Sequence, residues 1–425
     1  MFSLKEEKKN IKIILGITCL VFFLINVFSI IKYGNSTLLG NLSKPDNDDV
    51  KFIRSAWTLV ASGQYIYHNP GISTVFMMPG LPFTLAFFVE LFGKFGGITA
   101  FRFFQAIMQT GSLYLVFLIA KKIFNSKIAL AAVIINALCI ADYWVTNLIL
   151  TESLFKFFVL LLVYLSIYAI EKKSTRYYVF AGIIWAIGTY FRPTIATFPI
   201  IILIMWLLRK YSIKDMFRYG AIVAAIFCLM MSPWWIRNYT VFHKFVPLTL
   251  ATGNPMLQGT FINYDQTTKK TDGLDYSQFK YTGLEYDNNK VEMEISEYRL
   301  KNLVPKHPLE FLRWYTVGKT YYQIKAPFIW RDFLGVTTLE AGLGHNLILI
   351  FGLIGIVMFY LNKNRNKMGT IIFSMIIYFI VAYLPFYAFS RYFYPAIPFL
   401  IIFAAYSIMS TKEIFLEKYH KKISQ

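Results

Sequence analysis

Long apolar runs separated by short polar stretches form the pattern of this sequence. A helix that spans a bilayer needs about twenty mostly apolar residues at 1.5 Å rise per residue, and runs of this length recur from one end of the chain to the other. They predict about ten spanning helices, or about eleven if a shorter run at 79–92 also crosses. The predicted spans are 11–31, 103–120, 128–147, 152–170, 177–191, 194–208, 216–233, 343–361, 368–388 and 393–410.

The run from Pro79 to Phe92 is about 14 residues long, which is short for a span. If it crossed the bilayer, the basic cluster at 121–127 would lie on the opposite side from every other basic cluster, against the positive-inside rule. We therefore expect a re-entrant helix or one that lies in the membrane interface.

Basic residues lie between the apolar runs. The 425 residues carry a net charge of +20, yet only 16% of them are charged and 56% are hydrophobic. A nucleic-acid-binding protein would gather its basic residues on one domain or groove, whereas cytoplasmic loops of membrane proteins collect them in short stretches. We therefore expect a multi-pass protein of the cell membrane with both termini in the cytoplasm. The clusters are at 5–9, 121–127, 172–176, 209–218, 363–367 and 412–422.

This topology leaves two long segments on the non-cytoplasmic side. The first, 32–101, contains a predicted amphipathic helix from Asp48 to Ala61 that ends at Gly63. The second, 234–342, is polar enough to leave the membrane. We expect an all-α polytopic protein with three parts. They are a transmembrane module at 1–233 that includes the first external loop, an extracytoplasmic loop domain at 234–342, and C-terminal transmembrane helices with a basic cytoplasmic tail at 343–425.

Ionisable residues gather at the outer ends of the predicted spans. A charge near the apolar bilayer costs several kcal/mol unless it is paired or hydrated, so such residues are functional candidates. Arginine offers a planar donor fork suited to phosphate, and a carboxylate can act as a general base. We expect a pocket that binds an anion and moves a proton. The candidates are Asp48, Asp49, Arg102, Glu152, Arg192, Arg237 and Arg391.

Several of these residues also have a structural interpretation. Asp48 and Asp49 are suited to cap the loop helix, because acidic residues are favoured at a helix N-terminus, and Glu152 equally suits a first turn. Arg237 and Arg391 lie among Trp and Tyr residues, as interface anchors do.

Histidines and cysteines suggest no metal site. The histidines lack metal-ligand spacing, and the cysteines, Cys19, Cys139 and Cys228, each lie within an apolar run and offer no disulfide framework. No cofactor is predicted with certainty, and the sequence leaves open whether a divalent cation binds the carboxylates.

A set of short segments, taken in order, resembles the GT-C glycosyltransferases, close to the bacterial relatives of the dolichyl-phosphate-mannose protein mannosyltransferases and to the aminoarabinose transferases of lipid A. The resemblance runs from about residue 11 to 410. Its specificity comes from the order of the segments, their spacing and the side of the membrane on which they are expected to lie. MPGLP stands where the mannosyltransferases carry His-Pro-Pro-Leu, which leaves the acceptor open. The segments are DDVKFIRSAWTLVASGQY at 48–65, MPGLPF at 78–83, Arg102, TESLF at 151–155, RP at 192–193, PWWIRNY at 233–239 and SRYFYPAIP at 390–398.

The resemblance implies an enzyme that takes a sugar from a polyprenyl-phosphate donor and transfers it, with inversion, to a cell-envelope polymer, lipid or protein. It acts on the extracytoplasmic face and needs no nucleic acid. The resemblance places the base of the first external loop at Asp48, with Asp49 beside it, and a second acidic position at Glu152. The positions that face the lipid phosphate are Arg237, Arg391, Arg102 and Arg192.

Two other function classes share features with this sequence. A transporter or a lipid-linked-sugar flippase also has many spans and buried charges, but transporters often show repeated halves, and no repeat is visible here. A polysaccharide polymerase or ligase would use a lipid-pyrophosphate oligosaccharide, whereas the acidic pair at 48–49 favours transfer of one sugar.

Overall fold

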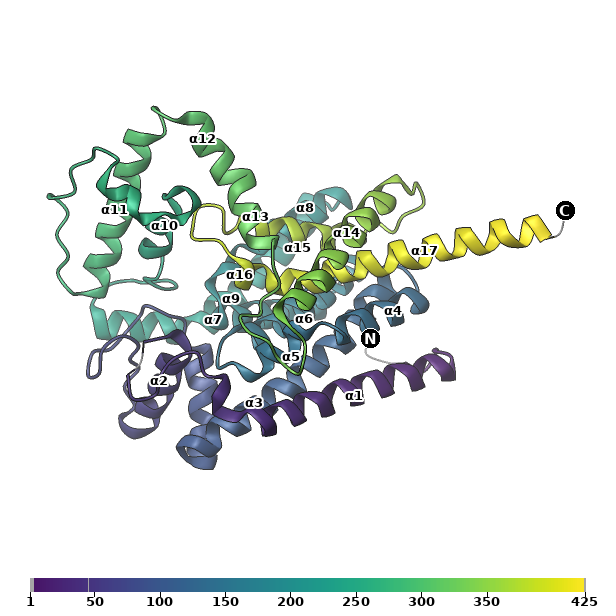
Figure 1. Cartoon of the computed structure of the whole chain (residues 1–425), viewed down its shortest axis with the longest axis horizontal. Helices are drawn as coiled ribbons and strands as arrows, with labels where there is room; N and C mark the ends of the chain where they lie inside the picture. Colours follow the sequence, from purple (N-terminus) through teal and green to yellow (C-terminus); the bar gives the residue numbers. More distant parts are fainter. Residues whose placement is uncertain (1–3, 45, 424–425) are drawn as a thin grey trace.

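Helices form the framework of the protein (Figure 1). A computed structural model describes residues 4–44 and 46–423, and side chains as far as residue 412. Within these ranges there are two isolated β-bridges and no strand. The chain is therefore all-α, as the sequence predicts.

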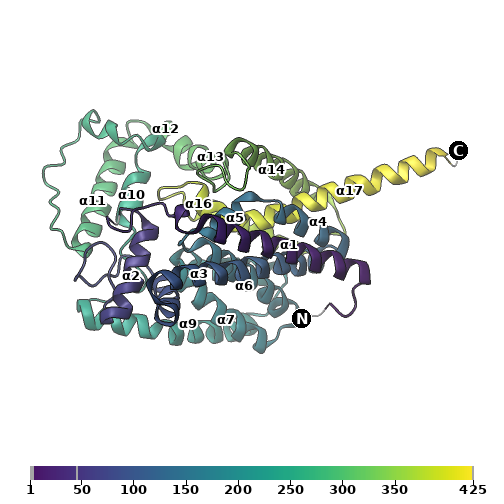
Figure 2. The same ribbon diagram turned by 60° about the horizontal axis from the view of Figure 1, so that its bottom comes forward.

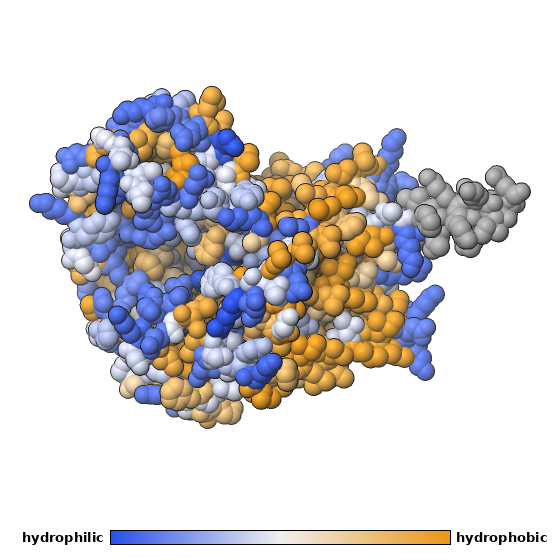
Figure 3. Space-filling model, viewed as in Figure 1, coloured by the Kyte–Doolittle hydropathy of each residue, from blue (hydrophilic) through white to orange (hydrophobic). Residues whose placement is uncertain are grey.

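The termini lie at one end of the helix bundle, and the long connecting segments lie at the other (Figures 1 and 2). We call the second end the loop end. On the face shown in Figure 3, hydrophilic residues cover the loop end, and a broad hydrophobic belt lies over the middle of the bundle. The helices that gather at the loop end are α2 (Asp48–Ser62), α10 (Gly253–Gly259), α11 (Glu285–Leu303) and α12 (Pro308–Arg313).

Six helical segments among the described residues are long and apolar enough to cross a membrane, or seven if one bent pair counts as a span. The protein is thus a multi-pass membrane protein, and the larger predicted number of spans stays a prediction. The six are α1 (Lys9–Tyr33), α3 (Gly80–Ile123), α6 (Glu152–Lys172), α9 (Ile213–Phe242), α14 (Thr338–Leu361) and Ser390–Lys412, which includes most of α17 (Ile397–Ile423). The bent pair is α4 (Ser126–Ala137) with α5 (Ile140–Asn147), at 56°.

The remaining elements are shorter. Three apolar helices, α7 (Thr175–Phe191), α8 (Pro199–Leu208) and α15 (Gly369–Val381), coincide with predicted spans. Single turns connect the longer helices. These turns are η1 (Gly34–Thr37), η2 (Pro193–Thr197), η3 (Ile262–Tyr264), η4 (Gln266–Lys270), η5 (Trp314–Gly318), α13 (Lys319–Ile324), α16 (Ser390–Phe393) and η6 (Tyr394–Ala396).

The helix α3 folds back on itself near its start. Gly93 has φ 74° and ψ 175°, which interrupts the helical path. A Cβ on Gly97 would lie 2.5 Å from the Cα of Val89, although eight residues of straight helix would separate these positions by about 12 Å. The segment 80–92 therefore packs against the beginning of the helix that follows it.

Burial separates inner from outer helices. The apolar windows of α6 and of Ser390–Lys412 are 78% and 72% buried, whereas those of α9 and α14 are 17% and 22% buried. Because a helix that faces lipid keeps its apolar residues exposed, α6 and the start of α17 form the interior. These two interior helices begin at the loop end with Glu152 and with the turn that contains Arg391.

The loop helix α2 confirms the sequence prediction closely. The side chain of Asn47 accepts a hydrogen bond from the Asp48 amide, and Gly63 ends the helix in the left-handed region at φ 71°, where glycine pays no steric penalty. Phe52 and Ile53 are buried against α3. This packing fixes where the first residues of α2 point.

Polar contacts bring distant basic segments together at the end that carries the termini. Lys121 pairs with Glu7, and Lys122 pairs with Glu171 at 2.7 Å. Asn366 donates to the Lys122 carbonyl at 3.1 Å. The side of the membrane on which these clusters lie stays a prediction, as does the division into three parts.

Candidate active site

Two arginines and two carboxylates meet at the loop end, and we call them the charge cluster. Nη1 of Arg391 donates to Oδ2 of Asp48 at 2.8 Å, and Nε of Arg391 donates to Oε1 of Glu152. Nη2 of Arg192 donates to the same Glu152 oxygen at 2.5 Å. Glu152 and both arginines are buried, whereas the Asp48 side chain is 35% exposed. Four segments far apart in the sequence thus place opposite charges in contact.

Local structure holds each member of the cluster in place. Asp48 opens α2, and its Oδ1 accepts a hydrogen bond from the Tyr67 hydroxyl at 2.8 Å. Arg192 ends α7 in an extended conformation, because the residue before a proline is disfavoured in the helical region and Pro193 follows. Nε of Arg192 donates to Oγ1 of Thr151 at 2.9 Å. The guanidinium of Arg192 is therefore fixed by two partners on neighbouring positions of one segment.

A cavity of about 600 Å³, the site cavity, borders this cluster. Asp48, Arg192 and Arg391 line it, together with Tyr383 and Tyr392. Nη1 of Arg192 is buried and has no hydrogen-bond partner among the described residues. The cavity thus offers one carboxylate and two cations.

The charge of Asp48 is held by its neighbours. Burial alone would raise the pKa of this carboxyl, but the charge and hydrogen bond of Arg391, the Tyr67 hydroxyl and Lys51 hold the pKa below its ordinary value. Asp48 is therefore ionised at neutral pH.

Asp49 faces the loop rather than the cavity. Its Oδ2 accepts the Leu39 amide at 2.5 Å and its Oδ1 accepts the Val50 amide at 2.8 Å. Burial raises the pKa of Asp49, against these backbone hydrogen bonds. The contacts of Asp49 are those of a residue that holds the preceding loop on α2.

Arg102 lies in the interior, away from the residues that line the site cavity. Its Nε donates to the Asn147 carbonyl at 2.8 Å and its Nη1 donates to Oδ1 of Asn35 at 2.9 Å. Arg102 thereby ties α3 to the end of α5 and to the turn after α1.

Arg237 is also outside the lining of the site cavity. Its Nη1 donates to the Thr74 carbonyl at 2.7 Å, and its guanidinium lies near the rings of Tyr65 and Trp234. Glu285 holds the same loop by accepting from Oγ1 of Thr74 at 2.8 Å. Arg102 lies near enough to Asp49 to interact with its charge, but none of the hydrogen bonds of Arg102 and Arg237 described above reaches the charge cluster, so their contact with a phosphate stays a prediction.

A divalent cation finds no ligand set here. Asp48 and Glu152 are the nearby carboxylates of the cluster, and both are engaged by Arg391. Within the described residues no group of three or more His, Cys, Asp or Glu side chains could hold a metal ion. The Arg391 guanidinium bridges Oε1 of Glu152 and Oδ2 of Asp48, and Oε2 of Glu152 has no hydrogen-bond partner among the described residues.

A second charge network escaped the sequence analysis. Nζ of Lys156 lies 2.7 Å from Oδ1 of Asp142, and both residues are buried. The Tyr394 hydroxyl donates to Oδ1 of Asp142 at 2.6 Å, and Asn136 donates to its Oδ2 at 2.6 Å. Asp142 and Lys156 lie inside predicted spans, so the rule that intramembrane charges are functional candidates would have identified them.

Part of the sequence matches a known family. The sequence model of the dolichyl-phosphate-mannose-protein mannosyltransferase family matches residues 77–236, which is less than half of the chain. The matched region contains Glu152 and Arg192 but neither Asp48 nor Arg391. No curated protein sequence matches the chain significantly.

Solved structures share the fold. The oligosaccharyltransferase of Archaeoglobus fulgidus in its apo form matches 99% of this chain and 53% of its own length, with a TM-score of 0.60 and 15% identity. The same archaeal enzyme, AglB, in complex with an inhibitory peptide and a dolichol-phosphate gives a TM-score of 0.55 at 14% identity, over 95% of this chain and 52% of that one. The chain thus spans about half the length of these enzymes, and at this identity the likeness establishes the fold alone.

Proposed function

We propose that this chain is a membrane glycosyltransferase of the GT-C superfamily and transfers a sugar from a polyprenyl-phosphate donor to a cell-envelope acceptor. One observation carries the proposal. Asp48, Arg192 and Arg391 line a single cavity, so a base and two phosphate-binding cations would face one reacting carbon.

The phosphate of the donor is assigned to the two arginines. Arg192 lines the cavity, and its Nη1 has no hydrogen-bond partner among the described residues, so a phosphate oxygen that reaches Nη1 would complete its hydrogen bonding. Arg391 is held by two carboxylates, so its orientation is set before the substrate arrives. Fixed donors of this kind stabilise charge that develops in a transition state without reorganising.

In the proposed reaction the acceptor hydroxyl gives its proton to Asp48 as its oxygen attacks the anomeric carbon. The new oxygen–carbon bond forms on the face opposite the donor phosphate, so the configuration inverts. The bond from carbon to the phosphate oxygen breaks, and its electron pair leaves with the polyprenyl phosphate, next to Arg192 and Arg391. Because Arg391 weakens Asp48 as a base, Asp48 orients the hydroxyl early and takes the proton late.

The outer face of the membrane is the proposed side of the reaction. The charge cluster lies at the loop end, and the basic clusters joined through Lys121 and Lys122 lie at the opposite end. Because basic loops favour the cytoplasm, the site cavity would open on the extracytoplasmic side.

Turnover by the purified full-length protein in lipid nanodiscs tests this proposal. The donor is a polyprenyl-phosphate hexose with a radiolabelled sugar, and the acceptor is a detergent extract of cell envelope. The products are the radiolabelled acceptor and released polyprenyl phosphate. We expect Asp48→Asn to lower kcat by about 10²- to 10⁴-fold, the usual contribution of a general base. Asp215→Asn is the control, because Asp215 pairs with exposed Lys173 in a surface contact outside the site.

The arginine pair is tested by donor binding. We expect Arg192→Lys to weaken binding of polyprenyl phosphate by about tenfold or more, because a charge-assisted hydrogen bond is lost. Arg218→Lys is the matched control and leaves the affinity unchanged, because Arg218 donates to Thr175 in an exposed contact and does not line the site cavity. If Asp48→Asn transfers sugar at the wild-type rate, the assignment of Asp48 as the base is wrong. If the protein prefers a pyrophosphate donor, a polymerase or ligase is favoured instead.

A further inference from the structure

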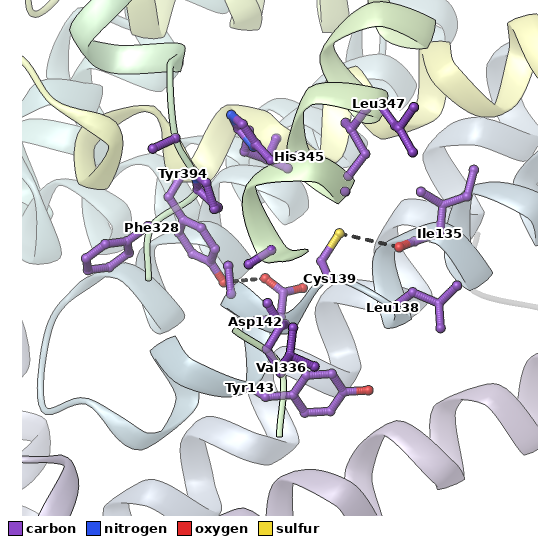
Figure 4. Close-up of a pocket in the computed structure, with 18 of the residues that line it drawn as sticks. Ile135, Leu138, Cys139, Asp142, Tyr143, Phe328, Val336, His345, Leu347 and Tyr394 are labelled. Carbon is purple, nitrogen blue, oxygen red and sulfur yellow. Dashed lines mark hydrogen bonds between the residues drawn. The ribbon is translucent and has the colours of Figure 1, made fainter. Parts of the chain in front are cut away.

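A second cavity, of about 590 Å³, lies beside the segment 390–396 (Figure 4). Its walls come from α1, from the break between α4 and α5, from residues 323–336, and from α14 and α17. In Figure 4, Leu138 and Leu347 lie toward one side of it, and Asp142 and Tyr394 lie toward the other.

One wall separates this cavity from the site cavity. Arg391 and Tyr392 line the site cavity, whereas Ser390, Phe393 and Tyr394 line the second one. The two cavities have no lining residue in common among the described residues. One bound chain therefore cannot fill both without crossing the wall.

The second cavity offers apolar surface rather than a site for a charged group. Of the two carboxylates in its lining, Asp142 is already bound by Lys156, Asn136 and Tyr394, and Glu340 accepts from the amide and the hydroxyl of Thr337 at 2.8 Å. Nε2 of His345, also in the lining, lies 2.7 Å from the Ile324 carbonyl oxygen. Oε1 of Gln323 is the buried polar atom of the lining that has no partner among the described residues. Because the charged groups are paired internally and most of the lining is apolar, the matching ligand is a hydrocarbon chain.

The cavity opens toward the bilayer. Three lining residues from different elements are exposed, namely Leu138 at 78%, Leu347 at 56% and Ile408 at 39%. Leu347 lies on α14, Ile408 lies on α17, and Leu138 lies in the break between α4 and α5. A lipid chain can therefore enter sideways, without leaving the hydrocarbon region.

The site cavity has an apolar exit of its own. Val381 lines the site cavity and is 53% exposed, so the tail of a donor held by Arg192 and Arg391 can leave from that side. A separate hydrocarbon site across the wall is then available to a second lipid.

We propose that the second cavity binds the hydrocarbon chain of the acceptor, and hence that the acceptor is a lipid of the outer leaflet. This inference rests on the proposed transferase function and narrows its acceptor from polymer, lipid or protein to lipid. Ser390 and Arg391 are adjacent and line different cavities, so the head group and the sugar need to meet only across this one segment.

Photo-crosslinking locates each lipid without turnover. Full-length protein is placed in nanodiscs that contain a phospholipid with a diazirine in its acyl chain, or a polyprenyl phosphate with a diazirine in its tail. We expect the acyl probe to label peptides around Leu138 and Leu347, and the polyprenyl probe to label peptides around Val381. Polyprenyl label in the second cavity, or no acyl label there, would overturn the assignment.

Gly344→Phe blocks the second cavity, and Gly342→Phe is its matched control. Both glycines lie in α14 with nothing within 4 Å of an added Cβ, but only Gly344 belongs to the lining. We expect Gly344→Phe to lower sugar incorporation into lipid by about 10- to 200-fold, the range of a mismatch in an apolar pocket, while binding of polyprenyl phosphate is unchanged. Gly342→Phe leaves both unchanged.

The outcomes separate this inference from the proposed function. Sugar transfer by the wild-type chain to a protein or polymer, but not to lipid, would overturn the lipid acceptor and leave the transferase intact. Equal incorporation by Gly344→Phe and wild type would do the same. Absence of any donor cleavage would overturn the transferase and the acceptor assignment together.

Discussion

Replacing Lys156 by methionine tests the second charge network. The change removes the ammonium group that lies 2.7 Å from Asp142 while keeping most of the side-chain volume. Asp142 is then buried with Asn136 and Tyr394 as its remaining donors. Breaking a buried ion pair on one side costs about 3–5 kcal/mol, because an uncompensated charge stays behind. The two remaining hydrogen bonds place the expected loss toward the lower end of that range.

Thermal unfolding of the detergent-purified protein, followed by tryptophan fluorescence, measures this loss. Lys173→Met is the control, because its pair with Asp215 is exposed and such pairs contribute about 0–1 kcal/mol. The double variant Lys156→Met with Asp142→Asn removes both charges, and we expect it to recover most of the stability. Equal destabilisation in the single and double variants would refute the reasoning, since the cost would then come from packing rather than from the orphaned charge.

Three further predictions concern other parts of the molecule. Gly355→Ala places a Cβ 2.0 Å from the Phe403 carbonyl oxygen, where α14 packs against α17. We expect this overpacking to lower the stability by about 1–3 kcal/mol in the same unfolding assay. Gly342→Ala, which has nothing within 4 Å of the added Cβ, is the control and has no effect. The lowered pKa of Asp48 means that its carboxylate persists at every pH above the ordinary 3.8, and its contribution is lost only as pH falls through the lowered value. Transfer rates should therefore show no acidic limb between pH 7 and pH 5, and a limb in that window would contradict the assignment of Asp48 as base. We also expect EDTA to leave the rate unchanged, because the two site carboxylates bind a guanidinium, and recovery by added Mg²⁺ or Mn²⁺ would show otherwise.

The parts of the fold that could be predicted well from the sequence are those set by local sequence patterns. The loop helix was predicted to end before Gly63, because a glycine that follows an apolar periodic segment marks a helix C-terminus. The apolar runs likewise located the helices, since bilayer thickness sets their length. The sequence analysis separates the helix at 79–92 from the span at 103–120, but it does not identify Gly93 as the point of the fold-back, because glycines also stand at 96 and 97 and a glycine alone does not tell a kink from a reversal.

The candidate site could be predicted only in part. Asp48 and Asp49 are neighbours, yet a step of one residue turns the side chain about 100° around the helix, so one carboxylate meets Arg391 and the other meets the Leu39 amide. Which face of α2 turns toward the cavity depends on its packing against α3. Arg192 and Arg237 present the same difficulty, because only the fold decides which of them reaches Glu152.

The charge cluster and the Asp142–Lys156 network both include a residue of α6. This shared helix gives a reason for the buried charges on α6. Glu152 and Lys156 are one turn apart on the same face of α6. Glu152 binds Arg391, and Lys156 binds Asp142, which accepts from Tyr394 three residues after Arg391. Apolar side chains would fill this space without a desolvation cost, but they could not fix the direction of a guanidinium. The wall between the cavities is therefore held at both ends by α6, so a change at Lys156 should reach the site through Arg391.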